Sequence, residues 1–124
     1  MNLVLVLVGG AAGAPARWYL DQVIQGRHDR AYPWGTFIIN VLGSFLLGAL
    51  LGGASVGGLT HGWVVLLGVG FCGAFTTFST FGFEAVRLIE RGRAGVGAAY
   101  VLSSLAAACA AAALGWAIGA AAWA

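Results

Sequence analysis

The sequence predicts an all-α integral membrane protein whose chain crosses the bilayer about four times. Of its 124 residues, 60% are apolar and only 8% are charged, whereas soluble domains carry about 25% charged residues. Residues 1–16, 31–83 and 94–124 contain no Asp, Glu, Lys or Arg. Because a helix needs roughly 20 apolar residues to cross a bilayer, we expect residues 1–124 to form one four-helix transmembrane domain. The protein would then be a multi-pass protein of the cell's inner (plasma) membrane.

The first predicted span covers residues 2–24, where Gly9, Gly13 and Arg17 recur every four residues on one helical face. The chain also starts like a signal peptide, with an apolar run and an A-x-A-like end. It lacks the positively charged first region of such peptides, so we expect this segment to remain as a span.

The second predicted span covers residues 34–51, after the polar loop QGRHDRAYP, in which Gly26 and Pro33 break the helix. One helical row of this span carries mostly small side chains: Asn40, Ser44, Gly48 and Gly52. Such a small-xxx-small row predicts that a neighbouring helix approaches closely.

The third predicted span covers residues 63–90 and the fourth covers residues 96–123, with GGASVGGLTHG and RGRAG as the turns before them. One face of the fourth span carries hydroxyl groups at i, i+3 and i+4: Tyr100, Ser103 and Ser104. Tryptophans fall near the ends of the predicted spans, as in an interfacial aromatic belt: Trp18, Trp34, Trp63 and Trp123.

All six basic residues are arginines, and they gather at two of the loops. Arg27 and Arg30 lie in the first loop and Arg91 and Arg93 in the third, whereas the second loop has none. By the positive-inside rule, we expect the first and third loops to face the cytoplasm and both termini to face outward.

The stretch GFCGAFTTFSTFGFE, residues 70–84, differs from a plain apolar span. Gly73 and Thr76 lie near the middle of the third span, which at about 1.5 Å rise per residue places them near the bilayer midplane. Glycines weaken a helix and hydroxyl groups compete for its backbone, so we expect an interruption around residues 73–77. Non-helical backbone at that depth must be buried in protein or line a polar cavity, and its free carbonyl groups could bind a cation.

Two interpretations of this stretch differ in what its polar groups do. In the first, the phenylalanines pack in a core and the threonines bond back to their own helix. That accounts for single residues, but the stretch carries four hydroxyl groups and Glu84. A buried hydroxyl without a partner costs about 1–3 kcal/mol. In the second interpretation, such intramembrane polar residues mark a functional site.

The residue chemistry leaves the charge of a transported ion open. Ring edges of phenylalanines favour an anion and ring faces favour a cation. The amide and hydroxyl groups of Asn40, Ser79 and Thr80 can donate hydrogen bonds to an anion without a fixed charge that would trap it. A small-anion pathway and a cation pathway remain equal alternatives on these grounds.

Other classes of function lack support in the sequence. Cys72 and Cys109 have no metal-ligand or redox spacing, so we expect them to be packing residues. No basic run could follow a phosphate backbone. His28 and His61 lie in loops without a carboxylate or nucleophile at a useful spacing, so we do not expect an enzyme.

Three stretches of the chain closely resemble the Fluc (CrcB) family of fluoride channels. They are GGAAGAPARW in the first span, GTFIINVLGSFLLG in the second and GFCGAFTTFSTFGFE in the third. The fourth span matches more weakly, through Tyr100 and the serines, and the length and four-helix layout agree. The resemblance implies a fluoride-selective channel that exports fluoride passively across the membrane and relieves its toxicity.

The resemblance also implies an antiparallel, dual-pore dimer with a central structural sodium ion. Backbone carbonyls of Gly73 and Thr76 from both subunits would hold that ion. Arg17 matches the family pattern at the pore mouth and Glu84 matches it at the end of the ion path. Each of these two residues would either contact the ion or form a structural pair.

In the same resemblance, specific side chains would line the fluoride path. Phe78 and Phe81 would turn their ring edges toward the ion, and Asn40 would donate a hydrogen bond to it. A polar track of hydroxyl groups would continue the path: Ser79, Thr80, Tyr100 and either Ser103 or Ser104.

The arginine bias departs from the simplest picture of this family, in which single-gene members insert in both orientations and show little bias. Our hypothesis is one fixed orientation, with an oppositely oriented, related subunit as the partner; a homodimer is the alternative. Two rival functions also remain. A small multidrug-type proton-coupled exporter would need a membrane-embedded carboxylate, and a non-transporting membrane subunit would use its helices only for assembly.

Overall fold

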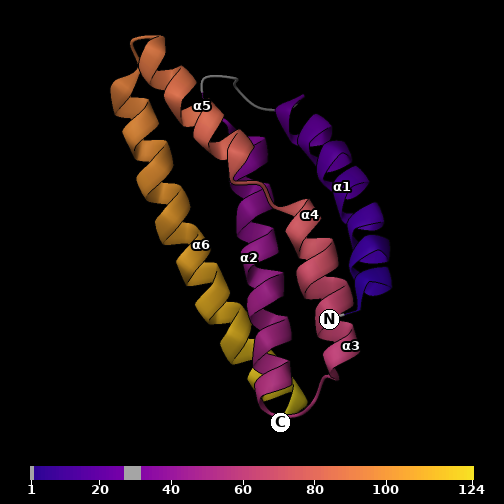
Figure 1. Ribbon diagram of the computed structural model, residues 1–124. Helices are drawn as coiled ribbons and strands as arrows, with labels where there is room; N and C mark the ends of the chain where they lie inside the picture. Colours follow the sequence, from indigo (N-terminus) through magenta and orange to yellow (C-terminus); the bar gives the residue numbers. More distant parts are fainter. Residues whose placement is uncertain (1, 27–31) are drawn as a thin grey trace.

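The computed structural model describes residues 2–26 and 32–124, and the described residues fold into helices without a strand (Figure 1). In chain order the elements are α1 (Leu3–Gln25), α2 (Trp34–Ser55), α3 (His61–Trp63), η1 (Val64–Cys72), α4 (Gly73–Phe75), α5 (Ser79–Glu90) and α6 (Ala94–Trp123). Elements α3 to α5 together make the third span, so among the described residues four stretches are long and apolar enough to cross a membrane. This confirms the predicted all-α class with four apolar spans.

The span ends lie close to those expected from the sequence. Span two continues to Ser55 rather than residue 51, and span four begins at Ala94 rather than residue 96. The Asn2 side chain caps α1 by accepting a hydrogen bond from the Val4 backbone N–H at 2.9 Å. Beyond α5, Gly92 adopts φ +78°, a left-handed conformation that glycine reaches without steric cost.

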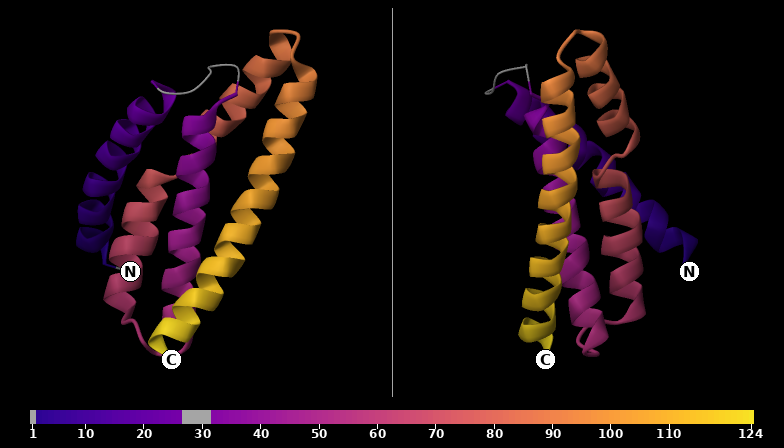
Figure 2. Two further views of the ribbon diagram at one scale, coloured as in Figure 1. Left: turned by 180° about the vertical axis from the view of Figure 1, so that it is seen from behind. Right: turned by 90° about the vertical axis from the view of Figure 1, so that its left-hand side faces the viewer.

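The helices α2 and α6 form the closest-packed pair, and they converge toward the C-terminal end of α6 (Figures 1 and 2). Glycines on each helix face the backbone of the other. A Cβ atom added at Gly48 or Gly52 would collide with the backbone of α6, and one at Gly115 or Gly119 would collide with α2. The small-xxx-small row predicted on the second span therefore packs as expected at Gly48 and Gly52.

A second pair forms between α1 and η1, also through glycines. A Cβ atom at Gly9 would collide with the Leu66 carbonyl, and one at Gly13 would collide with the Phe71 carbonyl. From the other side, a Cβ at Gly70 would lie 2.8 Å from the Val6 carbonyl oxygen. The glycine face predicted on the first span is thus the face that meets the third span.

Most large apolar side chains lie on the outside of this arrangement. Trp18 is 66% exposed and Leu102 is 68% exposed, and only 6% of the most apolar stretch of α6 is buried. In lipid, burying apolar surface between helices gives no hydrophobic stabilisation, so close packing and polar contacts must hold the helices together.

The third span is irregular in two places. Val64–Cys72 forms a π-helix, which the sequence pattern did not predict, and such segments often occur at functional sites. After α4 the chain leaves the helical path for residues 76–78, with Thr76 at φ −81° and ψ 160°, and α5 starts beside the end of α4 (Figure 2). Gly73, where the interruption was expected to begin, is helical.

Replacing Gly48 with alanine should destabilise the protein because the added methyl group meets the Ala112 backbone. Overpacking of this kind costs about 1–3 kcal/mol. The thermal unfolding temperature of the purified protein in detergent measures the effect. Gly95→Ala is the matched control, because a Cβ at this α6 position meets nothing within 4 Å. Equal unfolding temperatures for the two variants would contradict the packing described above.

Candidate functional site

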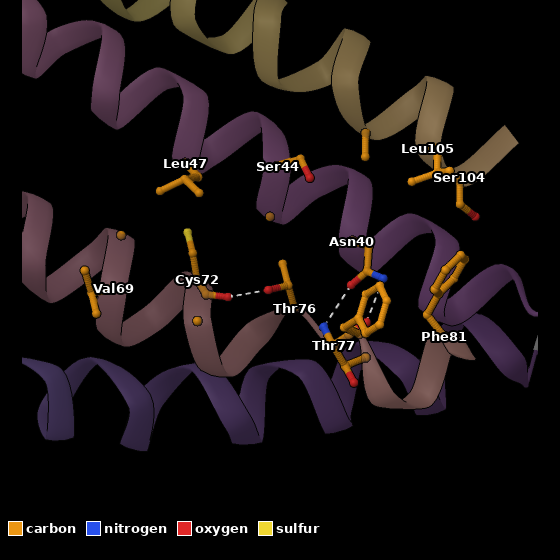
Figure 3. A pocket seen from close by; sticks show the side chains of 15 residues that line it. Asn40, Ser44, Leu47, Val69, Cys72, Thr76, Thr77, Phe81, Ser104 and Leu105 are labelled. Carbon is orange, nitrogen blue, oxygen red and sulfur yellow. Dashed lines mark hydrogen bonds between the residues drawn. The ribbon is translucent and has the colours of Figure 1, made fainter. Parts of the chain in front are cut away.

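The side chain of Asn40 on α2 holds the chain where the third span leaves the helix. Its Nδ2 donates to the Thr77 carbonyl at 2.9 Å, and its Oδ1 accepts from the Thr77 N–H at 2.9 Å (Figure 3). An amide has the same donor and acceptor as a peptide group, so Asn40 satisfies both backbone groups of Thr77. Without this partner they would be unpaired in an apolar environment, which costs several kcal/mol per group.

The pairing with Asn40 also changes the hydrogen bonding of the helix before it. In a continuous helix, the Thr77 N–H would be donated to the Gly73 carbonyl. Thr76 donates both its N–H and its Oγ1 to Cys72 O, at 2.9 and 2.8 Å. Within the two described stretches of chain, no donor reaches the carbonyl of Gly73 or Thr76. The carbonyl groups at the interruption, those of Gly73 and Thr76 among them, are therefore left with free lone pairs.

A hollow of about 570 Å³ lies beside this interruption, between α2, the third span and α6 (Figure 3). Its lining combines polar groups with apolar side chains, and none of the lining residues is charged. The polar and aromatic residues that line it are Asn40, Ser44, Thr76, Thr77, Phe78, Phe81 and Ser104. Gly73 and Cys72 also line it, so the free carbonyl of Gly73 belongs to a residue of this hollow.

Three aromatic rings follow one another beside the hollow. The Phe78 and Phe81 ring centroids lie 6.0 Å apart, and those of Phe81 and Tyr100 lie 5.1 Å apart. Tyr100 is fully buried, whereas Phe78 is 82% exposed. The sequence of rings therefore runs from the interior of the chain to its surface.

Ser79 and Thr80, two residues expected in the polar track, lie on the exposed surface of α5 and outside the hollow. Their local contacts are to Thr77: its Oγ1 accepts from the Thr80 N–H at 3.2 Å and lies 3.4 Å from the Ser79 hydroxyl. Within one chain, these two hydroxyl groups therefore lie apart from the residues that line the hollow, such as Asn40, Phe81 and Ser104.

A buried polar group lies further along α5, toward its C-terminal end. Thr36, only 3% exposed, donates its hydroxyl to Glu84 Oε1 at 2.5 Å. Tyr32 shares a 2.7 Å hydrogen bond with Ser103, and its ring meets that of Tyr100 edge-on at 5.4 Å. The sequence analysis missed Thr36, although it lies one turn before Asn40 in the row that continues through Ser44.

On α6, the buried Ser104 Oγ lacks a hydrogen-bond partner among the described residues. The Tyr100 Oη is also buried, and it lies close enough to Thr36 and Glu84 to interact with both. Polar atoms buried in a protein are paired in the large majority of cases. Both residues were expected in the polar track, and Ser104 lines the hollow. Ser103 instead is exposed and paired with Tyr32. Of the two serines left open by the sequence, the geometry favours Ser104.

Among the other described residues singled out from the sequence, Cys72 lines the hollow, whereas Arg17 and Cys109 do not. Arg17 is half-buried on α1 and one turn from Asp21, whose charge it opposes. Cys72 is buried and Cys109 is exposed. Arg27, His28 and Arg30 lie outside the described residues. In the described parts of the chain, no three His, Cys, Asp or Glu side chains gather as a metal site would require.

Replacing Asn40 with aspartate should destabilise the interruption. The second carboxylate oxygen would replace the amide N–H group and face the Thr77 carbonyl oxygen, so that two acceptors would meet without a donor. Leaving a buried group unpaired costs about 1–3 kcal/mol. The unfolding temperature in detergent should fall clearly for Asn40→Asp and little for Ser44→Ala. Ser44, the control, lies one turn away and also lines the hollow. An equal decrease for both variants would remove the special role of Asn40.

Comparison with known proteins places the chain in a family. The family model for CrcB-like proteins, described as "CrcB-like protein, Camphor Resistance (CrcB)", matches residues 4–116. The Fluoride-specific ion channel FluC 1 of Frankia casuarinae is 48% identical over 128 residues, with 99% of each chain covered. FluC 1 of Streptomyces avermitilis is 47% identical over 107 residues, with 86% of each chain covered.

A more distant relative, FluC 2 of Clostridium acetobutylicum, is 39% identical over 105 residues, with 85% of this chain and 86% of the relative covered. These relatives are named as ion channels and not as enzymes. Together with the four apolar spans, they make the protein a multi-pass membrane protein, which in bacteria belongs to the plasma membrane. The resemblance stated from the sequence is confirmed, and the chain belongs to the CrcB-like family.

Proposed function

We propose that this chain is a subunit of a fluoride-selective channel through which fluoride leaves the cell passively. The observation that carries the proposal is the uncharged hollow, which an amide, hydroxyl groups and phenylalanine rings line beside the interrupted span. Fluoride is small and strongly hydrated, so a dry path must replace its water contacts with protein donors. Neutral donors do this without holding the ion too tightly to leave. The names of the relatives support the same ion.

The direction of flow needs no coupled energy source. A cell interior that is negative by 100 mV drives an anion outward by about 2.3 kcal/mol per charge. The site therefore requires only selectivity and a continuous path. Neither requirement involves a catalytic step, which agrees with a function other than an enzyme.

In the proposed assembly, a second, antiparallel subunit completes the path. Phe78 is 82% exposed, and the Ser79 and Thr80 hydroxyls lie outside the hollow of their own chain. Non-helical backbone in the hydrocarbon region must be covered by protein or line a cavity, and the segment at residues 76–78 is such backbone. A partner lying against this face would cover it and would create two equivalent pores.

The central sodium ion is part of the same proposal. The Gly73 and Thr76 carbonyls lack donors within the described residues, and free carbonyls of unwound membrane helices are typical sodium ligands. The carbonyls of both subunits would hold the ion. When bound, sodium would neutralise their partial negative charges and link the two subunits.

Each lining residue then has a distinct role. Asn40 uses one of its two amide hydrogens for Thr77 and retains the other for fluoride. Phe78 and Phe81 present ring edges. The polar track consists of hydroxyl groups: Ser79, Thr80, Tyr100 and Ser104. Glu84, held by Thr36, marks the end of this track, and Arg17 marks the pore mouth.

The rival functions fit the geometry less well. A proton-coupled multidrug-type exporter needs a carboxylate that exchanges protons with its cargo, whereas Glu84 lies outside the hollow and accepts from Thr36. A subunit that serves only assembly would have no use for the unpaired hydroxyl of Ser104 in the hollow.

Purified protein in liposomes loaded with fluoride should release it rapidly when an ionophore supplies the counter-current, and chloride should be retained. A fluoride electrode and a chloride electrode measure the two fluxes. Proton-coupled uptake of a cationic drug without fluoride release would instead favour the exporter. No flux of either kind would favour the assembly subunit.

Phe78→Ile and Phe81→Ile keep an apolar side chain but remove the ring edge. Each should reduce fluoride flux by at least about tenfold, equivalent to about 1.4 kcal/mol in the barrier. Phe45→Ile is the control, because Phe45 does not line the hollow. If both variants conduct like the control, the two rings serve only packing.

The orientation hypothesis follows from the arginines at one end of the molecule. Arg91 and Arg93 flank the turn between α5 and α6; α6 ends at the opposite end of the molecule, and α1 starts in the same half (Figure 1). In a background without Cys72 and Cys109, single cysteines added at either terminus should react only with reagent outside the cell. Equal labelling from both sides would indicate dual insertion and a homodimer.

A further inference from the structure

A second hollow, of about 360 Å³, lies on the outer face of α5, near the end of that helix at the arginine-rich turn. Phe83, Val86, Arg87, Glu90 and Arg91 line it. This face points away from the one that carries Ala85 and Leu88, which pack with Tyr100 of α6. None of its residues lines the hollow at the interrupted span.

The lining changes from apolar to basic along the helix. Phe83 and Val86, nearer the middle of the span, are 65% and 53% exposed. Arg87 and Arg91, one turn apart at the helix end, are also exposed. Like charges at i and i+4 repel each other on a helix. Glu90 is the single carboxylate of the lining, so the hollow keeps an excess of positive charge, although Glu84 also attracts Arg87. A bound anion between the two guanidinium groups would offset their repulsion.

We propose that this hollow binds an anionic phospholipid of the leaflet next to the arginine-rich turn. Arg87 and Arg91 would hold the phosphate group, for which the planar guanidinium is well suited. The start of an acyl chain would lie along Phe83 and Val86. The ligand class is a phosphatidylglycerol-type lipid, with one negative charge and hydroxyl groups on its headgroup.

The apolar half of the hollow argues for a lipid and not for a free anion. A soluble phosphate would contact the arginines and leave Phe83 and Val86 without a role. Arginines at a helix end also help to set the orientation of a chain in the membrane. That role requires only positive charge near the membrane interface. It requires neither a hollow nor exposed apolar side chains continuous with the charge.

Glu90 distinguishes between two kinds of lipid headgroup. Its carboxylate lies in the same hollow and repels a phosphate, but it can accept a hydrogen bond from a headgroup hydroxyl. For phosphatidylglycerol, Glu90→Gln should therefore maintain or increase affinity. For zwitterionic phosphatidylethanolamine, the same change would remove the partner of the ammonium group and reduce affinity.

The experiment titrates phosphatidylglycerol into the delipidated full chain in neutral detergent, with native mass spectrometry counting bound lipid. One basic residue near a membrane surface contributes enough for about a fivefold change in affinity. Arg87→Gln and Arg91→Gln should each reduce affinity about fivefold, and the double variant about 25-fold, if the effects are independent. Phe83→Ser should also weaken binding, whereas Phe83→Leu should not.

Arg93→Gln is the matched control, because it removes the same charge from outside the hollow and should leave affinity unchanged. Equal losses for all three single arginine variants would show general attraction to positive charge and overturn the proposal. Displacement of the lipid by excess inorganic phosphate would also overturn it, as would tighter binding of phosphatidylethanolamine that Glu90→Gln weakens. The assay does not involve fluoride, so its outcome is independent of the proposed channel activity.

Discussion

The two hydrogen bonds between Asn40 and Thr77 are the contact on which the rest of the structure depends. A span in lipid must pair its backbone groups within protein, so an interruption is stable only where another element supplies partners. Asn40 supplies both partners of Thr77. It thereby diverts the N–H that would have continued the helix and leaves the Gly73 carbonyl free. It also fixes where α5 restarts, and hence where Phe78 and Phe81 lie.

Glycine contacts hold the helices around this point. Gly48 and Gly52 bring α2 against α6, and Gly9 and Gly13 bring α1 against η1. With lipid in place of water, burial of apolar area contributes little, and close backbone approach contributes more. The outside of the chain consequently stays apolar, and the non-helical segment at residues 76–78 includes the exposed Phe78. This is the reason that a second subunit is part of the proposed function.

Charge and polarity are distributed unevenly along the molecule. The hollow at the interrupted span contains donors and rings but no charge, whereas the end of α5 carries exposed arginines beside apolar side chains. Between them, Glu84 is held by the Thr36 hydroxyl. In the proposed function, the uncharged hollow serves an ion that must leave again. In the proposal for the outer face of α5, the basic end holds a lipid that remains.

The sequence by itself determined the fold class, the four spans, the close-packing glycine faces and the stretch that holds the site, because these follow from local composition and period. It also carried the family motifs. It predicted an interruption around residues 73–77 but not its position at residues 76–78. It also did not determine which hydroxyl pairs with Glu84, or that Ser79 and Thr80 lie outside the hollow of one chain. Those outcomes depend on contacts such as Asn40 with Thr77, 37 residues apart. Only the packed helices bring such partners within hydrogen-bonding distance.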